Sequence, residues 1–165
     1  DMGRIRFAID FQPQPLSESG MDAVRFLMSA NVGEELRPIQ KIASGGELAR
    51  IMLAIKNVLA EKDGIGTIIF DEVDTGVSGR AAQKIGKKLA EVARHRQVIC
   101  VTHLAPVAAC AAHHYRIYKT VEDGRTFTRV EELTRPQRVQ ELARIMVGEN
   151  ITDSALKSAE EMLES

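Results

Sequence analysis

A serine, two glycines and a glutamate stand together at residues 44–47, where a helical pattern begins. Backbone N–H groups at a helix N-terminus lack helical partners, and the helix dipole favours negative charge there. Gly45 and Gly46 would allow a ligand to approach the backbone closely, although glycine inside a helix costs about 1 kcal/mol relative to alanine. Ser44 and Glu47 also fit a capping box. The stretch therefore predicts an anion site for a phosphorylated ligand, or a helix cap alone.

Two carboxylates, Asp71 and Glu72, follow the apolar run at residues 67–70. Adjacent carboxylates repel each other unless a cation or hydrogen-bond donors compensate. Mg²⁺ bound through Asp71 would relieve this repulsion and leave Glu72 free to take a proton from an attacking water. The simpler interpretation is a pair of solvated acids at a strand end.

His103 follows a second apolar run, at residues 97–102, and a helical pattern lies between the two runs. A strand, helix and strand of this length predict a βαβ crossover with parallel strands, whose C-terminal ends share one edge of the sheet. Asp71, Glu72 and His103 can then converge on one phosphate-sized ligand. Asp74 lies in a loop that could be no more than a turn before the next helix.

A complete P-loop nucleotide site needs the pattern Gly-x-x-x-x-Gly-Lys-Ser/Thr to wrap the phosphates, and this chain has none. The nearest match, from Gly79 to Lys88, has the wrong glycine spacing, lacks the hydroxyl and lies within a predicted helix. We therefore expect the chain not to hold a nucleotide tightly by itself.

Hydrophobic periodicity predicts the elements that position these residues. One face of the helix from Ser44, carrying Leu48, Ile51, Met52 and Ile55, is expected to be buried, with Arg50 facing outward. The first strand is expected to be half-buried and to end at Pro13 and Pro15. The predicted strands are 4–11, 23–29, 67–70, 97–102, 114–119 and 126–133, and the predicted helices are 44–59, 79–94, 106–112, 136–147 and 152–163.

Length and composition indicate a globular α/β chain, with residues 1–165 forming a single domain. The chain is 44% hydrophobic and 27% charged, and its net charge of −1 lacks the excess of Lys and Arg that is typical of nucleic-acid-binding domains. Cys100 and Cys110 lack both metal-ligand spacing and a secreted disulfide framework, and no apolar run reaches the ~20 residues that span a bilayer. These features favour a cytoplasmic location. The abrupt start without methionine suggests part of a longer protein.

The motifs resemble those of ABC-type ATPase heads. Residues 43–47 are similar to the ABC signature motif, residues 68–72 to the Walker B strand with its catalytic glutamate, residues 73–76 to the D-loop, and His103 to the switch histidine. Ala43 and Glu47 favour the SMC-like branch over membrane transporters. Longer phrases resemble the bacterial RecN family, which is SMC-like and acts in double-strand break repair; they are Lys41-Ile-Ala-Ser-Gly-Gly-Glu-Leu-Ala-Arg50, residues 70–79, residues 101–107 and Glu141-Leu-Ala-Arg-Ile-Met146.

The resemblance implies a fold, a mechanism and partners. The fold would be the C-terminal lobe of a P-loop NTPase-like ABC/SMC head, an α/β lobe with a mainly parallel sheet flanked by helices, incomplete without an N-terminal lobe that carries Walker A. Two heads would sandwich ATP and clamp or tether DNA during repair and recombination after DNA damage, in a nucleoid-associated setting. The implied partners are the N-terminal lobe, a second head, DNA and, as a further candidate, RecA recombinase.

The resemblance also implies a role for each site residue. Ser44, Gly45 and Gly46 would contact the γ-phosphate held by the opposite head, Glu47 would belong to the same cofactor-binding motif, and Asp74 would couple the two sites. Asp71 would support Mg²⁺, Glu72 would act as the general base and His103 would sense the γ-phosphate. Two other hypotheses remain: a non-catalytic interaction domain, and a stand-alone Mg²⁺-dependent phosphotransferase or nuclease that uses Asp71, Glu72 and Asp74.

Overall fold

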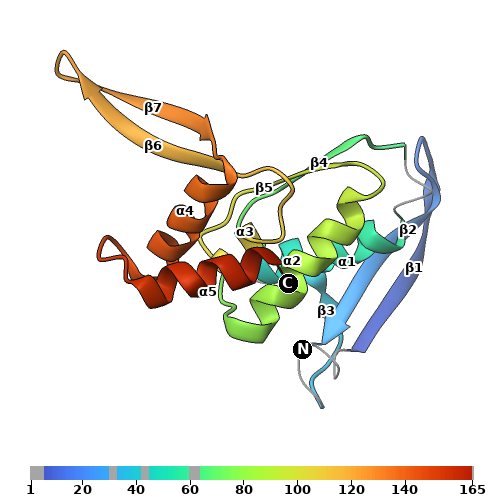
Figure 1. The fold of residues 1–165 in the computed structure, drawn as a ribbon. Helices are drawn as coiled ribbons and strands as arrows, with labels where there is room; N and C mark the ends of the chain where they lie inside the picture. The colour runs from blue at the N-terminus through green and yellow to red at the C-terminus, as the bar shows by residue number, and fades with distance from the viewer. Residues whose placement is uncertain (1–5, 30–32, 42–44, 60–63, 165) are drawn as a thin grey trace.

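The computed structural model describes residues 6–29, 33–41, 45–59 and 64–164 (Figure 1). In chain order its elements are β1 (Arg6–Ser17), β2 (Gly20–Ser29), β3 (Arg37–Pro38), the 3₁₀ helix η1 (Ile39–Lys41), α1 (Gly45–Val58), β4 (Thr67–Phe70), α2 (Gly79–Ala93), β5 (Gln97–Cys100), α3 (Ala105–Ala108), β6 (Tyr115–Glu122), β7 (Arg125–Glu132), α4 (Arg135–Val147) and α5 (Asp153–Glu164). Among the described residues, every helix is too short or too polar to cross a membrane.

The unit β4–α2–β5 forms the centre of the molecule and confirms the predicted βαβ crossover. The two strands are parallel, with Ile69 opposite Ile99 and Phe70 opposite Cys100. Four apolar residues of α2 recur at helical spacing and are buried against the strands, namely Ala82, Ile85, Leu89 and Val92. Because the strands are parallel, the residues that follow them lie at one edge of the sheet.

The prediction of a mainly parallel sheet is wrong for the described residues. They form three small sheets, and only the pair β4–β5 is parallel. The sheet β1–β2–β3 and the hairpin β6–β7 are antiparallel. The physical reason lies in the connections, since tight turns after Ser17 and Glu122 join antiparallel neighbours, whereas parallel strands need a long crossover such as α2.

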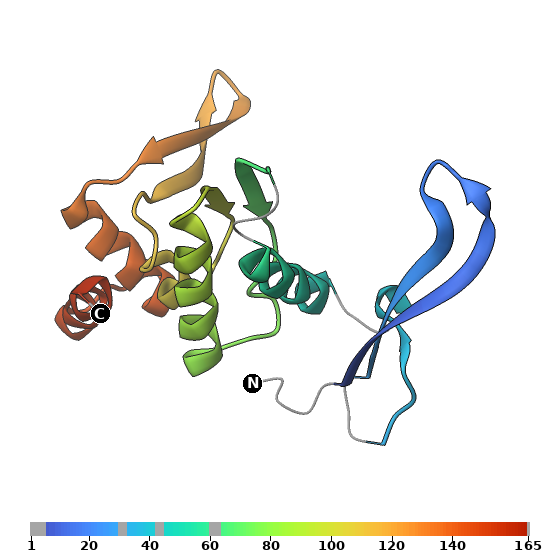
Figure 2. The same ribbon diagram turned by 90° about the vertical axis from the view of Figure 1, so that its right-hand side faces the viewer.

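Two apolar clusters hold the helices in place. The larger one joins α1, α2 and β4, and the smaller one joins α3, α4 and α5 (Figures 1 and 2). In α1, only Leu53 and Gly46 are buried, while Leu48 and Met52 remain exposed. The predicted burial of a whole apolar face of α1 is therefore wrong, because no described element covers this side of the helix.

The first strand also differs from its prediction. Strand β1 continues past Pro13 and Pro15 to Ser17, with an irregular register between Pro13 and Ser17. Proline is tolerated there because β1 is an edge strand, whose outward groups need no ladder partner. Phe7 and Phe11 are exposed rather than half-buried. The β1–β2 hairpin projects from the helical body (Figure 2), so one apolar face of its sheet has no cover within the described residues.

Candidate functional site

The start of α1 lies against the loop that follows β4. A Cβ atom added to Gly46 would lie 2.8 Å from the backbone oxygen of Thr75, closer than real Cβ contacts. A Cβ atom on Gly45 would lie 3.4 Å from Oε2 of Glu72, which is an ordinary contact distance. The close contact with Thr75 therefore explains why residue 46 is a glycine. Gly45, in contrast, is exposed and lies beside Glu72, the predicted base. Ser44 and its predicted capping box lie outside the described residues; Glu47 is in the first turn of α1.

Asp71 and Glu72 are both exposed directly after β4. The backbone of Glu72 has φ 59°, a left-handed conformation that non-glycine residues adopt rarely and at a cost. Among the described residues, no group of three or more histidine, cysteine, aspartate or glutamate side chains could hold a metal ion. A single exposed carboxylate still fits Mg²⁺, which takes one or two protein carboxylates together with phosphate oxygens and water.

Asp74 points into the protein and contacts the end of β5. Its side chain is only 1% exposed, and its Oδ2 accepts hydrogen bonds from Oγ1 of Thr102 and from the backbone N–H of His103 at 3.3 Å. Nδ1 of His103 lies 3.6 Å from the same oxygen, and the histidine side chain is 73% exposed. The structure thus places Asp71, Glu72, Asp74 and His103 at one sheet edge, with the imidazole open to a ligand.

The carboxylates also influence a neighbouring thiol. The pKa of Cys100 is raised from its ordinary 9.0 to about 11, first because burial disfavours the thiolate and then because Asp74 and Asp71 are negatively charged. Cys100 is therefore a neutral thiol at physiological pH.

Two residues of the site are not apparent from the sequence pattern. Arg50 was expected to face outward, yet its Nη1 donates to the backbone oxygen of Thr75 at 2.9 Å and to that of Val73 at 3.4 Å. Thr102 connects the two loops through its bond to Asp74. The available signal for Arg50 was its position one helical turn after Gly46, which puts both on the same face of α1.

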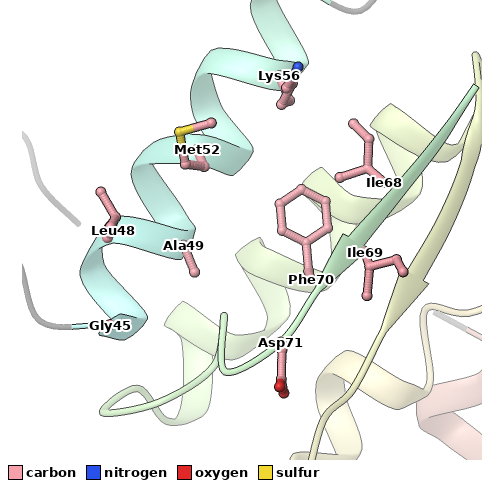
Figure 3. A pocket seen from close by; sticks show the side chains of 9 residues that line it. All are labelled: Gly45, Leu48, Ala49, Met52, Lys56, Ile68, Ile69, Phe70 and Asp71. Atoms are coloured by element: carbon pink, nitrogen blue, oxygen red, sulfur yellow. The ribbon is translucent and has the colours of Figure 1, made fainter. Parts of the chain in front are cut away.

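A groove of about 360 Å³ lies between α1 and β4, next to this site (Figure 3). It is lined mainly by apolar side chains, including Leu48, Met52 and Ile69, and Lys56 and Asp71 are its charged residues. Such a lining suits apolar side chains of another protein element better than a triphosphate.

Comparisons with known proteins show what the chain is similar to in sequence and in fold. No model of a known protein family matches the chain. The DNA repair protein RecN of Bacillus subtilis is 48% identical over 155 residues, which are 94% of this chain and 27% of that protein. The chain thus spans little more than a quarter of this relative.

Solved structures with a similar fold are heads of SMC proteins. The Smc head domain of Pyrococcus yayanosii, with a coiled coil and joint, has a TM-score of 0.59 at 20% identity and covers 85% of this chain and 26% of that chain. A structure from a study of ATP-driven dimerization and DNA stimulated activation of SMC ATPases has a TM-score of 0.50 at 20% identity, covering 75% of this chain and 73% of that chain. The chain is therefore a homologue of about a quarter of the DNA repair protein RecN, and its fold is similar to that of SMC head domains.

Proposed function

We propose that the chain, as one domain, supplies the C-terminal half of an ATP-hydrolysing head that works only with an N-terminal Walker A lobe and a second head. One observation carries the proposal: the sheet edge that presents Asp71, Glu72 and His103 lies beside the start of α1. These are the positions that an ATP sandwich would need for water activation and for phosphate contact.

Within this head, each residue has one role. Glu72 takes the proton of the attacking water, and His103 donates to the γ-phosphate of the chain's own nucleotide. Mg²⁺, bound with help from Asp71, would neutralise phosphate charge. Ser44, Gly45 and Gly46 bind the γ-phosphate of the opposite head, where backbone N–H groups and the helix dipole stabilise negative charge, and Glu47 completes the same cofactor-binding motif.

The uncovered apolar surfaces are a second argument that an N-terminal lobe packs against this chain. Ile69 is 67% exposed, and Ile99 and Val101 of the same sheet face are also exposed. Parallel strands are normally covered on both faces. An N-terminal lobe seated on this face and in the groove of Figure 3 would complete the sheet and bring the Walker A motif to the site.

Other partners follow from the similar proteins. One of the similar structures comes from work on SMC ATPases whose dimerization is driven by ATP and whose activation is stimulated by DNA. We extend this behaviour to a homodimer of heads that clamps or tethers DNA in the bacterial cytoplasm, at the nucleoid, during double-strand break repair. RecA recombinase is a further candidate partner, to be tested by direct binding.

Reconstitution tests the proposal. ATP hydrolysis is measured for the chain alone, for a RecN N-terminal lobe alone and for their mixture. We expect hydrolysis only in the mixture, and its loss in Glu72→Gln, because the amide cannot accept the proton. The matched control is Glu160→Gln, an exposed residue of α5 whose loss should leave the rate unchanged. Mg²⁺-dependent activity of the chain alone would instead favour a stand-alone phosphotransferase or nuclease, and no activity in the mixture would favour an interaction domain.

A further inference from the structure

The loop between β4 and α2 holds Glu72, the proposed general base, in an unfavourable backbone conformation. Glu72 has φ 59°, and a left-handed conformation at a non-glycine residue persists only where the surroundings enforce it. The loop's own bonds are backbone turns, from the N–H of Thr75 to the oxygen of Glu72 at 3.1 Å and from the N–H of Val77 to the oxygen of Asp74 at 3.3 Å. Both bonds join residues of the same loop, so they do not attach the loop to the rest of the protein.

Arg50 fixes one side of this loop. Its Nη1 lies between the backbone oxygens of Val73 and Thr75, the residues on either side of Asp74. A guanidinium donor makes charge-assisted hydrogen bonds, which are stronger than those of neutral groups. Gly46 allows the contact, because any side chain there would meet Thr75. Arg50 therefore ties α1 to the loop beside the close approach of Gly46 to the backbone of Thr75.

Asp74 fixes the other side. Its buried carboxylate accepts from Thr102 and from the backbone of His103, on the strand end opposite α1. The segment carrying Glu72 is thus held between α1 and β5, and Oε2 of Glu72 lies close to Gly45.

We infer that Arg50 is a positioning residue for the reaction, which sets the direction of the Glu72 carboxylate by holding the backbone of Val73 and Thr75. The inference rests on the proposed function, and deepens it. It connects, within one chain, the helix start that would contact the partner's nucleotide to the base that would act on the chain's own nucleotide. Closing of the dimer against α1 would then be transmitted to Glu72 through Arg50.

The test uses the complete head, meaning this chain joined to the N-terminal Walker A lobe. Arg50→Gln should lower kcat about 10- to 100-fold, since a small displacement of a catalytic group has effects of this size, and should change the KM for ATP little. Arg50→Lys should retain more activity, because an ammonium can still donate to both oxygens. The control Arg125→Gln removes the same charge from the exposed start of β7 and should behave like the unaltered head.

A second measurement separates positioning from a merely structural role. In a Glu72→Gln background, adding Arg50→Gln should not lower the residual rate further, because the base through which Arg50 acts is already absent. ATP-dependent dimerisation of the double variant, followed by light scattering, should match that of Glu72→Gln.

Three outcomes would overturn the inference. Arg50→Gln could hydrolyse ATP at the same rate as Arg125→Gln. The rate reductions caused by Arg50→Gln and Glu72→Gln could multiply in the double variant. The double variant could also lose ATP-dependent dimerisation. If Arg50→Gln fails to fold, Arg50→Met decides, because it keeps an unbranched stem without a donor, and a rate equal to that of the unaltered head would rule out the positioning role. Failure of the proposed function is distinct, since the unaltered head would then not hydrolyse ATP, and the role of Arg50 would fall with it.

Discussion

Gly45 and Gly46 are neighbours in the sequence but lie against different surroundings. Gly46 is buried against the backbone of Thr75, whereas Gly45 is exposed next to the carboxylate of Glu72. One glycine is therefore required by packing within the chain, and the other is available to a ligand.

Alanine substitution should separate these two roles. Gly46→Ala puts a methyl group 2.8 Å from the backbone oxygen of Thr75, so the backbone must shift to accommodate it. We expect a net loss of about 1–2 kcal/mol in the free energy of unfolding, because overpacking exceeds the gain in helix propensity. Gly45→Ala should not lower this free energy, although it should slow hydrolysis by the complete head. Urea denaturation of the two variants measures the difference; equal stability of both would contradict the close contact at Gly46.

Cys100 gives a pH-dependent prediction at the residue scale. Its pKa is about 11 in the folded chain against an ordinary 9.0, so the folded state binds this proton more tightly than the unfolded state. The resulting stability is fully present below pH 9.0 and is lost as the pH rises from 9.0 to about 11. We expect Cys100→Ser to unfold with less dependence on pH in this window. A thiolate absorbance that titrates below pH 9.0 in a Cys110→Ser variant would contradict the assignment.

At the scale of elements, the two faces of β4 differ sharply. Phe70 is 4% exposed in the larger apolar cluster, whereas Ile69, its neighbour, is 67% exposed on the other face. Side chains of a strand point alternately to its two faces, and in β4 both faces carry apolar residues. This pattern is typical of a sheet that is covered on both sides.

Substitution on one face should lower the stability of the chain, whereas substitution on the other should weaken binding of the N-terminal lobe. Phe70→Ala should lower the free energy of unfolding of the chain by about 3–5 kcal/mol, as for other large core truncations. Ile69→Thr should leave the chain's stability within about 0.5 kcal/mol, because exposed sites contribute little. It should, however, weaken binding of the N-terminal lobe, measured by calorimetry. Unchanged lobe binding in Ile69→Thr would show that the lobe does not cover this face.

The elements that could be predicted from the sequence are those governed by local rules. The limits of β4, the apolar face of α2 and the turn at Asp123 and Gly124 follow from periodicity and turn chemistry. The parallel pairing of β4 and β5 follows from their crossover, and it brought His103 to the edge that carries Asp71. The position of these residues was therefore predictable without a structure.

Other features depend on contacts that no local rule specifies. The continuation of β1 past Pro13 depends on its being an edge strand, and the exposure of Phe7 depends on the absence of a covering layer among the described residues. Arg50 sits on a helix where an outward cation is the common outcome, and only the proximity of Thr75 turns it inward. The coupling of two sites across a dimer by Asp74 stays a prediction, and the structure adds that its buried carboxylate bonds to Thr102 and His103 within the chain.

At the scale of the whole molecule, the chain has uncovered apolar surface on several elements. One face of β4–β5, the outer side of α1 and the β1–β2 hairpin all expose large apolar side chains. Exposed apolar area of this extent marks interaction sites. A two-lobe head would cover the first two, and its dimer would place the start of α1 against a nucleotide that belongs to the other head.

The most direct test of this arrangement mixes two inactive complete heads, Ser44→Arg and Glu72→Gln. If the start of α1 serves the partner's nucleotide, a mixed dimer contains one site with an intact Ser44 and an intact Glu72. Random pairing should then restore about a quarter of the unaltered ATP hydrolysis rate, because half of the dimers are mixed and each has one of two sites intact. If the mixture stays as inactive as either variant alone, both residues act on the same nucleotide and the shared-site arrangement is contradicted.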